Sequence, residues 1–488
     1  MGEQLMLSEM RIGHECALAG VILGQESNEI FRLLSNGLDA QNHRGEEAAG
    51  MAWSDGGRIF GEKNLGLRQA ALSDSFMSSL PPISVAIGHT RYSTAGKPNR
   101  LNAQPFVFEE QRFAIAHNGN VHWNIPPGPG EPTSDTYGIG KQIARGAGSI
   151  TENMIQTLPQ LNGAYSFLFM TPGGLFAARD PWGFRPLIGG KLDNGVNGYV
   201  VGSESIGPNS MHAHNLENIP RGTLIQVHPD GYEVIWQDQR VNEVPQSGCT
   251  FENAYFADAA SRIDVSIQGE RTNHELRVEL GRRLYQRAGP NGDFVTPIPN
   301  SGRSYAEGVS LESGIPLVQA IHTNRHAGRN FIKPQTPEER IEAAFKKYLF
   351  IPELIRGKKL IIVDDSMVRG STMSGLILNL FQLGASDIDV LIGVPPIKHP
   401  CYWGIDFQNP NSLIYNMLMK NENSVSFEDK LSSWLVAGDK TLSAHLRIFF
   451  QELDDYHSIM GEGCFHCVSG IIPGGALTDQ GMTKERFD

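Results

Sequence analysis

Two neighbouring aspartates, Asp364 and Asp365, directly follow an apolar run, LIIV, at residues 360–363. Such a run is typical of a buried strand, which would hold both carboxylates at a rigid sheet edge. Carboxylates there can accept hydrogen bonds from sugar hydroxyls or help to hold a hydrated Mg²⁺ ion. The loop SMVRGST, residues 366–372, then supplies backbone N–H groups and hydroxyls ahead of a helix, which cradles phosphate. A plain acidic loop with a capping hydroxyl is the alternative, but strand, loop and helix in this order favour a phosphorylated sugar.

Cys16 is a candidate nucleophile because of the motifs that follow it. A lone cysteine in a setting such as HECALAGV, residues 14–21, is more often a small buried apolar residue. Four polar motifs come after it in the chain: NHRGEEAAG at 42–50, GHTRYSTAG at 88–96, AHNGN at 116–120 and TSDT at 133–136. Together they resemble, in order and spread, the N-terminal-nucleophile glutaminase unit of glutamine phosphoribosylpyrophosphate amidotransferases.

This resemblance implies a definite chemistry for Cys16. The release of ammonia from an amide needs a nucleophile and a base. A cysteine that is the first residue of its chain supplies both, because its thiolate attacks and its own α-amino group titrates near neutral pH. That arrangement requires the removal of residues 1–15, which we therefore expect to be a propeptide.

The same resemblance implies four further residues of a glutamine site. The side chain of Asn118 and the backbone N–H of Gly119 would stabilise the oxyanion that forms on the amide. Arg91 would pair with the carboxylate of glutamine, and Asp135 would pair with its ammonium group. Without the surrounding motifs, Arg91 and Asp135 would be interpreted as a surface ion-pair partner and a helix-start carboxylate.

The string at residues 360–372 resembles the phosphoribosyl pyrophosphate motif of type I phosphoribosyltransferases, and PIPNSGR at 297–303 resembles their pyrophosphate loop. The resemblance implies one Mg²⁺ per subunit between Ser301, Asp364 and Asp365. It also implies a substrate site made of Ser301, Gly302, Asp364, Asp365, Ser366, Met367, Val368, Arg369, Gly370, Ser371 and Thr372.

Four other cysteines remain, Cys249, Cys401, Cys464 and Cys467. The last two have the C-x-x-C spacing of metal ligands or redox pairs, and four thiolates suit zinc or an iron–sulfur cluster about equally. The segments at 249–252, 399–406 and 463–467 resemble those that ligate a 4Fe–4S cluster in one branch of the family, which also has the propeptide. The resemblance therefore implies one 4Fe–4S cluster per subunit.

Short extended runs in the first half, at residues 85–89, 113–117, 165–170 and 199–201, are typical of strands. Residues 28–38 and 135–147 are predicted helices, the second with Ser134 available as its N-cap. Strands and helices do not alternate one for one here, which predicts a layered α+β unit. The resemblance specifies an αββα sandwich over residues 16–240.

The second half changes character. Residues 294–297, 317–320, 360–363 and 390–394 are predicted buried strands, and residues 372–384 are a predicted helix that Gly384 can end. This alternation predicts an α/β unit with a parallel sheet and ligands at the carboxyl ends of its strands. We place the boundary in the polar stretch 237–248. The resemblance implies a type I phosphoribosyltransferase unit over residues 241–488 that ends in a cluster-binding tail.

The composition sets limits on partners. The chain has 488 residues and a formal net charge of −12, with no block of basic residues, so binding to nucleic acid is not expected. No apolar run approaches membrane-spanning length, and residues 1–15 carry acidic residues rather than a secretory pattern. We therefore expect a cytoplasmic protein with small-molecule substrates.

Several positions depart from the family pattern. Asn300 stands where the pyrophosphate loop usually has Asp, Asp258 where a nearby segment has Arg, and Glu46 where the glutaminase motif has Gln. A loop at residues 323–332 resembles the one that closes over the phosphoribosyl substrate, but Thr323 and His326 replace its usual Lys and Tyr. The transferase site therefore carries less positive charge, and each lost charge-assisted contact would weaken binding by about 1.5–3 kcal/mol.

The resemblance as a whole implies an enzyme that transfers ammonia from glutamine to phosphoribosyl pyrophosphate, in the first committed step of purine biosynthesis. It also implies a homotetramer that purine nucleotides inhibit at the phosphoribosyl site. Two alternatives stay open: a paralogue that aminates another acceptor, and a non-catalytic sensor of phosphoribosyl pyrophosphate. The substitutions above motivate the first, whereas Cys16 with its companion motifs argues against the second.

Overall fold

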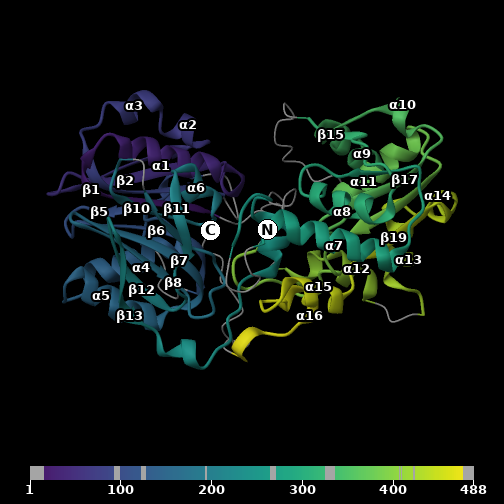
Figure 1. Ribbon diagram of the computed structural model, residues 1–488. Helices are drawn as coiled ribbons and strands as arrows, with labels where there is room; N and C mark the ends of the chain where they lie inside the picture. Colours follow the sequence, from purple (N-terminus) through teal and green to yellow (C-terminus); the bar gives the residue numbers. More distant parts are fainter. Residues whose placement is uncertain are drawn as a thin grey trace.

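The computed structural model describes residues 16–92, 99–122, 128–192, 195–263, 271–324, 336–405, 407, 409–420 and 424–475. Two lobes lie side by side, the first half of the chain in one and the second half in the other (Figure 1). The expected propeptide at residues 1–15 lies outside the described residues. So do residues 325–335, which include most of the expected closing loop at 323–332.

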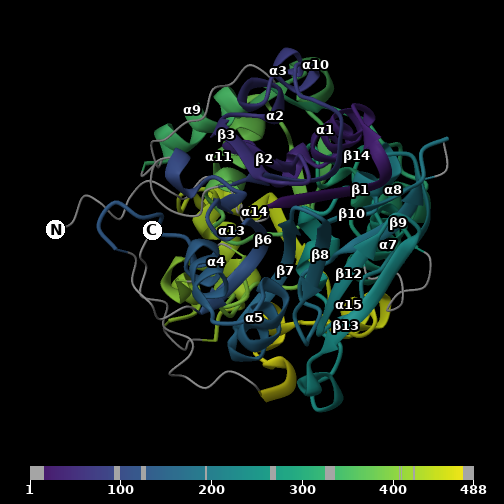
Figure 2. The ribbon, with the colours of Figure 1, turned by 90° about the vertical axis from the view of Figure 1, so that its left-hand side faces the viewer.

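The first lobe contains two antiparallel sheets stacked face to face (Figure 2). One has the order β11 (Ala213–Asn218), β9 (Ile188–Leu192), β10 (Gly198–Gly202), β1 (Ala17–Ser27), β4 (Ile83–Arg91), β2 (Ala48–Ser54) and β3 (Ile59–Leu65). The other has the order β13 (Gly231–Gln237), β12 (Thr223–His228), β8 (Gly174–Arg179), β7 (Asn162–Thr171), β6 (Phe113–His122) and β5 (Phe106–Phe108).

Alternation along β1 explains why this lobe has four layers. Successive side chains of a strand point to opposite faces of the sheet. Leu18 and Ile22 join the core between the two sheets, whereas Ala19, Val21 and Leu23 join the core under the outer helices. The helices of this lobe are α1 (Glu29–Ala40), α2 (Arg68–Ala71), α3 (Asp74–Ser78), α4 (Asp135–Arg145), α5 (Ile150–Thr157) and α6 (Ile206–Ser210).

Helix α1 covers the first sheet, and α4 with α5 covers the second, so the lobe is an αββα sandwich. The layered α+β prediction is confirmed. The predicted helices at 28–38 and 135–147 are confirmed as α1 and α4 to within two residues. Ser134 is the N-cap residue of α4, but its side chain makes no capping hydrogen bond.

The second lobe is built on a parallel sheet in the order β14 (Phe294–Pro297), β17 (Lys359–Asp364), β18 (Asp387–Ile392) and β19 (Leu446–Phe450). A separate antiparallel pair, β15 (Ile321–Thr323) and β16 (Tyr348–Phe350), stands beside it. The helices are α7 (Asn273–Ala288), α8 (Arg303–Ser313), α9 (Pro337–Lys347), α10 (Pro352–Ile355), α11 (Ser371–Gln382), α12 (Ile414–Met419), α13 (Phe427–Leu435), α14 (Lys440–Ala444), α15 (Leu453–Met460) and α16 (His466–Ser469). Short helical turns are η1 (Asn42–Arg44), η2 (Arg100–Asn102), η3 (Leu158–Gln160), η4 (Gln239–Asn242), η6 (Pro410–Ser412), η7 (Pro473–Gly475) and the π-helix η5 (Glu252–Phe256).

The parallel sheet of the second lobe confirms the α/β prediction. One strand prediction is wrong: residues 317–320 form no strand, and Leu317 makes only an isolated bridge to Val295. Pro316 has no N–H to continue a ladder, and the chain turns away into β15 after Ala320. Among the described residues, no helix has the length and apolar character that crossing a membrane requires.

Candidate active site

Cys16 lies immediately before β1, so the first sheet fixes its main chain. Its backbone nitrogen donates to Oδ1 of Asn118 at 3.3 Å, and its carbonyl oxygen accepts from Nε of Arg44 at 3.1 Å. Burial raises the pKa of the Cys16 thiol, while the positive charges of Arg91 and Arg44 oppose that rise. Cys16 is only partly buried, and a partly exposed thiol next to two cations is a suitable setting for a thiolate nucleophile.

Asn118 and Gly119 lie on β6, opposite Ser166 and Tyr165 of β7. Nδ2 of Asn118 is buried and has no hydrogen-bond partner among the described residues. Gly119 has a φ of +150°, and a Cβ there would come within 2.1 Å of the carbonyl oxygen of Ala164. Position 119 therefore requires glycine, and the amide of Asn118 offers an unused donor close to Cys16.

Arg91 ends β4 and Asp135 begins α4, so the two charged side chains come from different layers of the sandwich. The carboxylate of Asp135 accepts from the backbone nitrogens of Val121 at 3.0 Å and Thr136 at 2.7 Å. Nη1 of Arg91 donates to the carbonyl oxygen of Asn102. The positive charge of Arg91 lowers the pKa of the Cys16 thiol and the negative charge of Asp135 raises it, so both charges act on the same sulfur.

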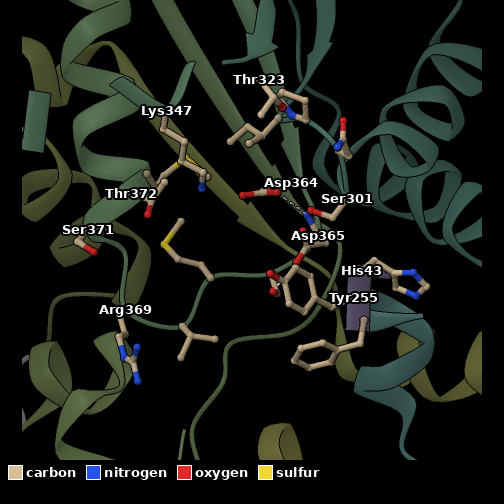
Figure 3. A pocket seen from close by; sticks show the side chains of 18 of the residues that line it. His43, Tyr255, Ser301, Thr323, Lys347, Asp364, Asp365, Arg369, Ser371 and Thr372 are labelled. Carbon is tan, nitrogen blue, oxygen red and sulfur yellow. Dashed lines mark hydrogen bonds between the residues drawn. The ribbon is translucent and has the colours of Figure 1, made fainter. Parts of the chain in front are cut away.

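A pocket of about 420 Å³ opens at the carboxyl end of β17 (Figure 3). Asp364, Asp365 and Ser301 face one another across its floor, and Ser366 donates from Oγ to Oδ1 of Asp365 at 2.5 Å. Burial raises the pKa of Asp364, and the adjacent negative charge of Asp365 raises it further. One buried and one partly buried carboxylate side by side are costly to ionise unless a cation compensates them, which fits a divalent ion between them and Ser301.

The loop after Asp365 leads into α11, as the sequence predicts. Gly370 is the N-cap residue of α11 with a φ of +73°, and a Cβ there would lie 2.9 Å from the ring of Trp434. The pocket is lined by every residue predicted for this loop, namely Ser366, Met367, Val368, Arg369, Gly370, Ser371 and Thr372. Gly302 is not among the described lining residues; it is the N-cap residue of α8, and its nitrogen donates to the carbonyl oxygen of Ile298.

The sequence prediction missed several lining residues. Lys347, the last residue of α9, lines the pocket, and its positive charge lowers the pKa of Asp364. A lysine at a helix C-terminus is common because it complements the helix dipole, so its spacing gave no signal of a site. The other missed lining residues are His43, Arg44, Tyr92, Tyr255, Phe256, Ile298, Pro299, Tyr348 and Met373.

Three of the positions that depart from the family pattern, Glu46, Asn300 and Thr323, line this pocket. Asp258 does not line it among the described residues. Its backbone nitrogen instead donates to Oε2 of Glu204 at 2.9 Å. The unusual residues therefore concentrate where the phosphoribosyl substrate is expected.

Tyr92 connects the two candidate sites. Its backbone hydrogen bond to the Cys16 thiol contributes to lowering the pKa of that thiol, and the residue also lines the pocket that holds Asp364. Arg44 behaves in the same way, since it bonds the carbonyl oxygen of Cys16 and lines the same pocket. The candidate nucleophile and the paired aspartates therefore share a wall.

The four remaining cysteines come together at the junction of the lobes, in one apolar core with Trp182, Phe184 and Trp403. Cys249 and Cys464 form a parallel β-bridge, and all four are free thiols. Burial raises the pKa of Cys249 to about 12, and the charges of Cys401 and Glu252 contribute, while Arg185 opposes them. Burial also raises the pKa of Cys467, and the negative charges of the other three cysteines raise it further.

Among the described residues no three His, Cys, Asp or Glu side chains are grouped as a single metal ion requires. A cubane cluster holds its four thiolates farther apart than a single ion does. Four free thiols from three segments, two of them buried and two partly buried, lie within electrostatic reach of one another and fit the donor set of a four-thiolate cluster.

An N-terminal-nucleophile hydrolase sandwich joined to a type I phosphoribosyltransferase sheet defines a class of two-part enzymes with one site in each lobe. No protein-family model matches the chain. Amidophosphoribosyltransferase from Mycobacterium tuberculosis strain H37Rv is 36% identical to it over 430 residues, which cover 84% of this chain and 78% of the relative. The Drosophila melanogaster enzyme of the same name is 31% identical over 499 residues, which cover 95% and 89%.

Solved structures agree with these relatives. The Bacillus subtilis glutamine phosphoribosylpyrophosphate amidotransferase, in complex with ADP and GMP, superposes with a TM-score of 0.79 at 28% identity, covering 95% of this chain and 98% of that one. A structure described as the allosteric regulatory enzyme of purine biosynthesis gives a TM-score of 0.80 at 29% identity, covering 95% and 97%. The chain belongs to the amidophosphoribosyltransferase family.

Proposed function

We propose that this chain hydrolyses glutamine at Cys16 and transfers the ammonia to C1 of phosphoribosyl pyrophosphate, giving glutamate, 5-phosphoribosylamine and pyrophosphate. This is glutamine-dependent amination in purine biosynthesis, a pentosyl transfer. The single observation that carries it is the shared wall: Tyr92 and Arg44 contact Cys16 and also line the pocket of Asp364 and Asp365. The two candidate sites are therefore adjacent, which supports the direct passage of ammonia from one to the other.

In the glutamine half, the Cys16 thiolate attacks the amide carbon, and a thioester forms as the C–N bond breaks. The amide of Asn118 and the backbone N–H of Gly119 stabilise the oxyanion, and Nδ2 of Asn118, which has no hydrogen-bond partner in the described part of the chain, supports this role. Arg91 binds the carboxylate of glutamine and Asp135 its ammonium group. Water then hydrolyses the thioester to glutamate. The proposal includes removal of residues 1–15, which frees the α-amino group of Cys16 as the base.

In the transferase half, the nitrogen of ammonia bonds to C1 of the ribose as the C1–O bond to pyrophosphate breaks. Ser301, Asp364 and Asp365 would hold one Mg²⁺, which would neutralise charge on the leaving pyrophosphate. The loop from Ser366 to Thr372 binds the 5′-phosphate, and Gly302 keeps the pyrophosphate loop close to α8. Lys347 adds a positive charge opposite the anionic substrate.

The four cysteines would hold one 4Fe–4S cluster per subunit. Their burial, their free thiols and their mutual electrostatic effect support this, and the cluster would tie the C-terminal tail to the junction of the lobes. We place the domain boundary at residues 240 and 241, after β13. The complex of the Bacillus subtilis relative with ADP and GMP supports inhibition by purine nucleotides. A homotetramer and a cytoplasmic location stay predictions.

A second candidate has a specific observation in its favour. Glu46 and Thr323 line the transferase pocket and both make it less positive than the family pattern, whereas Asn300, which also lines it, removes a negative charge. A pocket of this kind suits a paralogue that keeps glutamine hydrolysis and aminates another acceptor.

One experiment separates the candidates. Pyrophosphate release is measured with phosphoribosyl pyrophosphate and either glutamine or ammonium chloride. We expect release with both nitrogen sources, loss of only the glutamine-dependent rate in Cys16→Ala, and loss of both rates in Asp364→Asn with Asp365→Asn. Glutamate formation without pyrophosphate release would refute the proposal and favour the second candidate. Absence of both would favour a non-catalytic sensor.

A further inference from the structure

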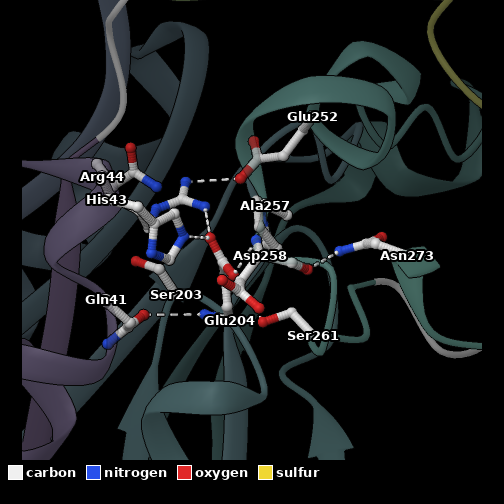
Figure 4. A network of polar contacts seen from close by, with 12 residues as sticks. Gln41, His43, Arg44, Ser203, Glu204, Glu252, Ala257, Asp258, Ser261 and Asn273 are labelled. Carbon is white, nitrogen blue, oxygen red and sulfur yellow. Dashed lines mark hydrogen bonds and ion pairs between the residues drawn. The ribbon is translucent and has the colours of Figure 1, made fainter. Parts of the chain in front are cut away.

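A buried chain of alternating charges crosses the junction between the lobes, and Figure 4 shows three of its members, Arg44, Glu204 and Glu252. Nη1 of Arg44 pairs with Oε1 of Glu204 at 2.5 Å, and Nη2 of Arg44 pairs with Oε1 of Glu252 at 2.6 Å. The other oxygen of Glu252 accepts from Nη1 of Arg185 at 2.9 Å. The side chains of all four residues are at most 1% exposed. Fully buried charges are tolerated only when each has a partner, so the two arginines and two glutamates form one neutral unit.

The four members come from both lobes. Arg44 ends η1, Arg185 follows β8, and Glu204 follows β10, all in the sandwich. Glu252 begins the π-helix η5, beyond the proposed domain boundary. Glu252 is therefore the one member of this chain of charges that belongs to the transferase side.

Arg44 connects this network to the nucleophile. Its Nε donates to the carbonyl oxygen of Cys16 at 3.1 Å while both terminal nitrogens are held by carboxylates. A planar guanidinium with all of its edges engaged has one orientation, and that orientation sets where the Cys16 carbonyl lies. If Glu252 lost its charge, the ion pair that holds Nη2 of Arg44 would be lost, and the Nε–H could turn with the guanidinium.

The carboxylate of Glu252 is itself held firmly. Arg185 bridges it to the carbonyl oxygen of Trp403, two residues after Cys401. The backbone nitrogen of Glu252 donates to the carbonyl oxygen of Cys249 at 3.2 Å. The segments that carry two of the four cysteines thus fix the anion that fixes Arg44.

We propose that Glu252 is a positioning residue for glutamine hydrolysis, supplied by the transferase side, which acts through Arg44 on the main chain of Cys16. This rests on the proposed role of Cys16 as the nucleophile. Glu252 touches neither substrate, so its removal impairs the attack on glutamine and leaves the binding of glutamine and the amination of the sugar intact.

The test is Glu252→Gln in the full chain, which keeps the size of the side chain and removes its charge. We expect kcat with glutamine to fall about 10- to 100-fold, because small displacements of a reacting group cost rates of this order. The KM for glutamine and the rate with ammonium chloride stay unchanged. Arg44→Lys should also lower kcat with glutamine, and with glutamine the double variant should be no slower than the worse single variant, because both act through one contact.

Asp389→Asn is the matched control. Asp389 is also a buried carboxylate of the second lobe and pairs through both oxygens with Arg447, but it has no link to Arg44. Any loss of stability there should change the glutamine and ammonia rates equally. Equal loss of both rates in Glu252→Gln, or an unchanged ratio between them, would overturn the inference.

Failure of the proposed function gives a different result. If the wild-type chain hydrolyses glutamine but does not aminate the sugar, the role of Glu252 is read from glutamate formation and from the alkylation rate of Cys16 by iodoacetamide. Both should still fall in Glu252→Gln and stay unchanged in Asp389→Asn. If neither falls, the positioning role is wrong whatever the acceptor.

Discussion

Asn118 holds the backbone nitrogen of Cys16 through its Oδ1 at 3.3 Å, and its Nδ2 is buried without a hydrogen-bond partner among the described residues. Contact through the oxygen fixes the orientation of the amide. The opposite end of the amide is then an oriented donor next to the candidate nucleophile. A buried donor left unsatisfied costs free energy, so it is expected to be used when glutamine is bound.

Asn118→Ala should lower kcat with glutamine by about 10²- to 10³-fold, because removal of one oxyanion donor costs about 2.7–4 kcal/mol in the transition state. The KM for glutamine should change little, since the proposed binding residues, Arg91 and Asp135, would hold the ends of the molecule that do not react. Steady-state glutamate formation measures both constants. The rate with ammonium chloride is the control, and an equal fall there would mean that the sandwich is damaged rather than the oxyanion site.

Lys347→Met should raise the KM for phosphoribosyl pyrophosphate by about tenfold or more. Loss of a charge-assisted contact costs about 1.5–3 kcal/mol, and methionine keeps the length and apolar stem of the side chain. Lys347→Arg should keep most of the affinity. Initial rates with ammonium chloride isolate this site from glutamine hydrolysis.

Lys346→Met is the matched control for that change. Lys346 is the neighbouring lysine, is 54% exposed and pairs with Glu342 on the surface of α9. It should leave the KM for phosphoribosyl pyrophosphate unchanged. If both substitutions raise this KM alike, the effect comes from the overall charge of α9 and the assignment of Lys347 to the pocket is wrong.

Local strings in the sequence were enough to predict both halves of the fold. The strand, loop and helix around Asp364 occupy a few consecutive residues, and the structure has them as β17, a loop and α11. The layered character of the first half followed from its strands, which do not alternate with helices. The strand prediction for residues 317–320 failed because an apolar run does not show that Pro316 cannot donate to a ladder. It also does not show that Leu317 is 41% exposed.

Residues that act across the junction could not be predicted from local patterns. Lys347 lies at the end of a helix and Tyr92 follows a strand, and neither has a spacing relation to Asp364. Glu252 and Arg44 are separated by about two hundred residues in the chain, and only the packing of the lobes makes them an ion pair. The roles of the individual site residues stay predictions that the variants above test.

His89 should make the sandwich less stable as the pH falls. Burial, followed by the positive charge of Arg91, lowers the pKa of His89 to about 3. The unfolded chain has a histidine pKa of about 6.5, so between these values it binds a proton that the folded chain does not. The free energy of unfolding therefore falls with decreasing pH, by about 1.4 kcal/mol per pH unit below about 6.5 for this residue.

Urea unfolding followed at about pH 7 and about pH 5.5 measures this dependence. The pH dependence of the free energy of unfolding should be smaller in His89→Gln, by close to one proton. Glutamine can still donate to the carbonyl oxygen of His117, which His89 contacts through Nε2 at 3.1 Å, so this contact is kept. His228→Gln, which replaces a histidine that is 40% exposed, is the matched substitution for comparison. A slope in His89→Gln equal to that of the wild type would show that His89 is protonated in the folded chain.

Removal of the expected cluster should weaken the junction of the lobes. Two carbonyl oxygens of the loop after Cys401 accept hydrogen bonds from the sandwich, that of Tyr402 from Nδ2 of Asn120 at 2.9 Å and that of Trp403 from Nη2 of Arg185. A cluster on Cys401 would fix this loop, because binding of a metal centre to the folded state stabilises it.

Anaerobically purified chain should therefore contain about four iron and four sulfide per subunit, and intact mass should place the N-terminus at Cys16.

Cys401→Ser should lose most of the iron and unfold at a lower temperature, whereas Cys16→Ser should keep the iron. Because Asn120 lies two residues from Asn118 on β6, the loss of iron should also reduce the glutamine-dependent rate more than the ammonia-dependent rate. Stoichiometric zinc, or full iron content in Cys401→Ser, would exclude the four-cysteine cluster.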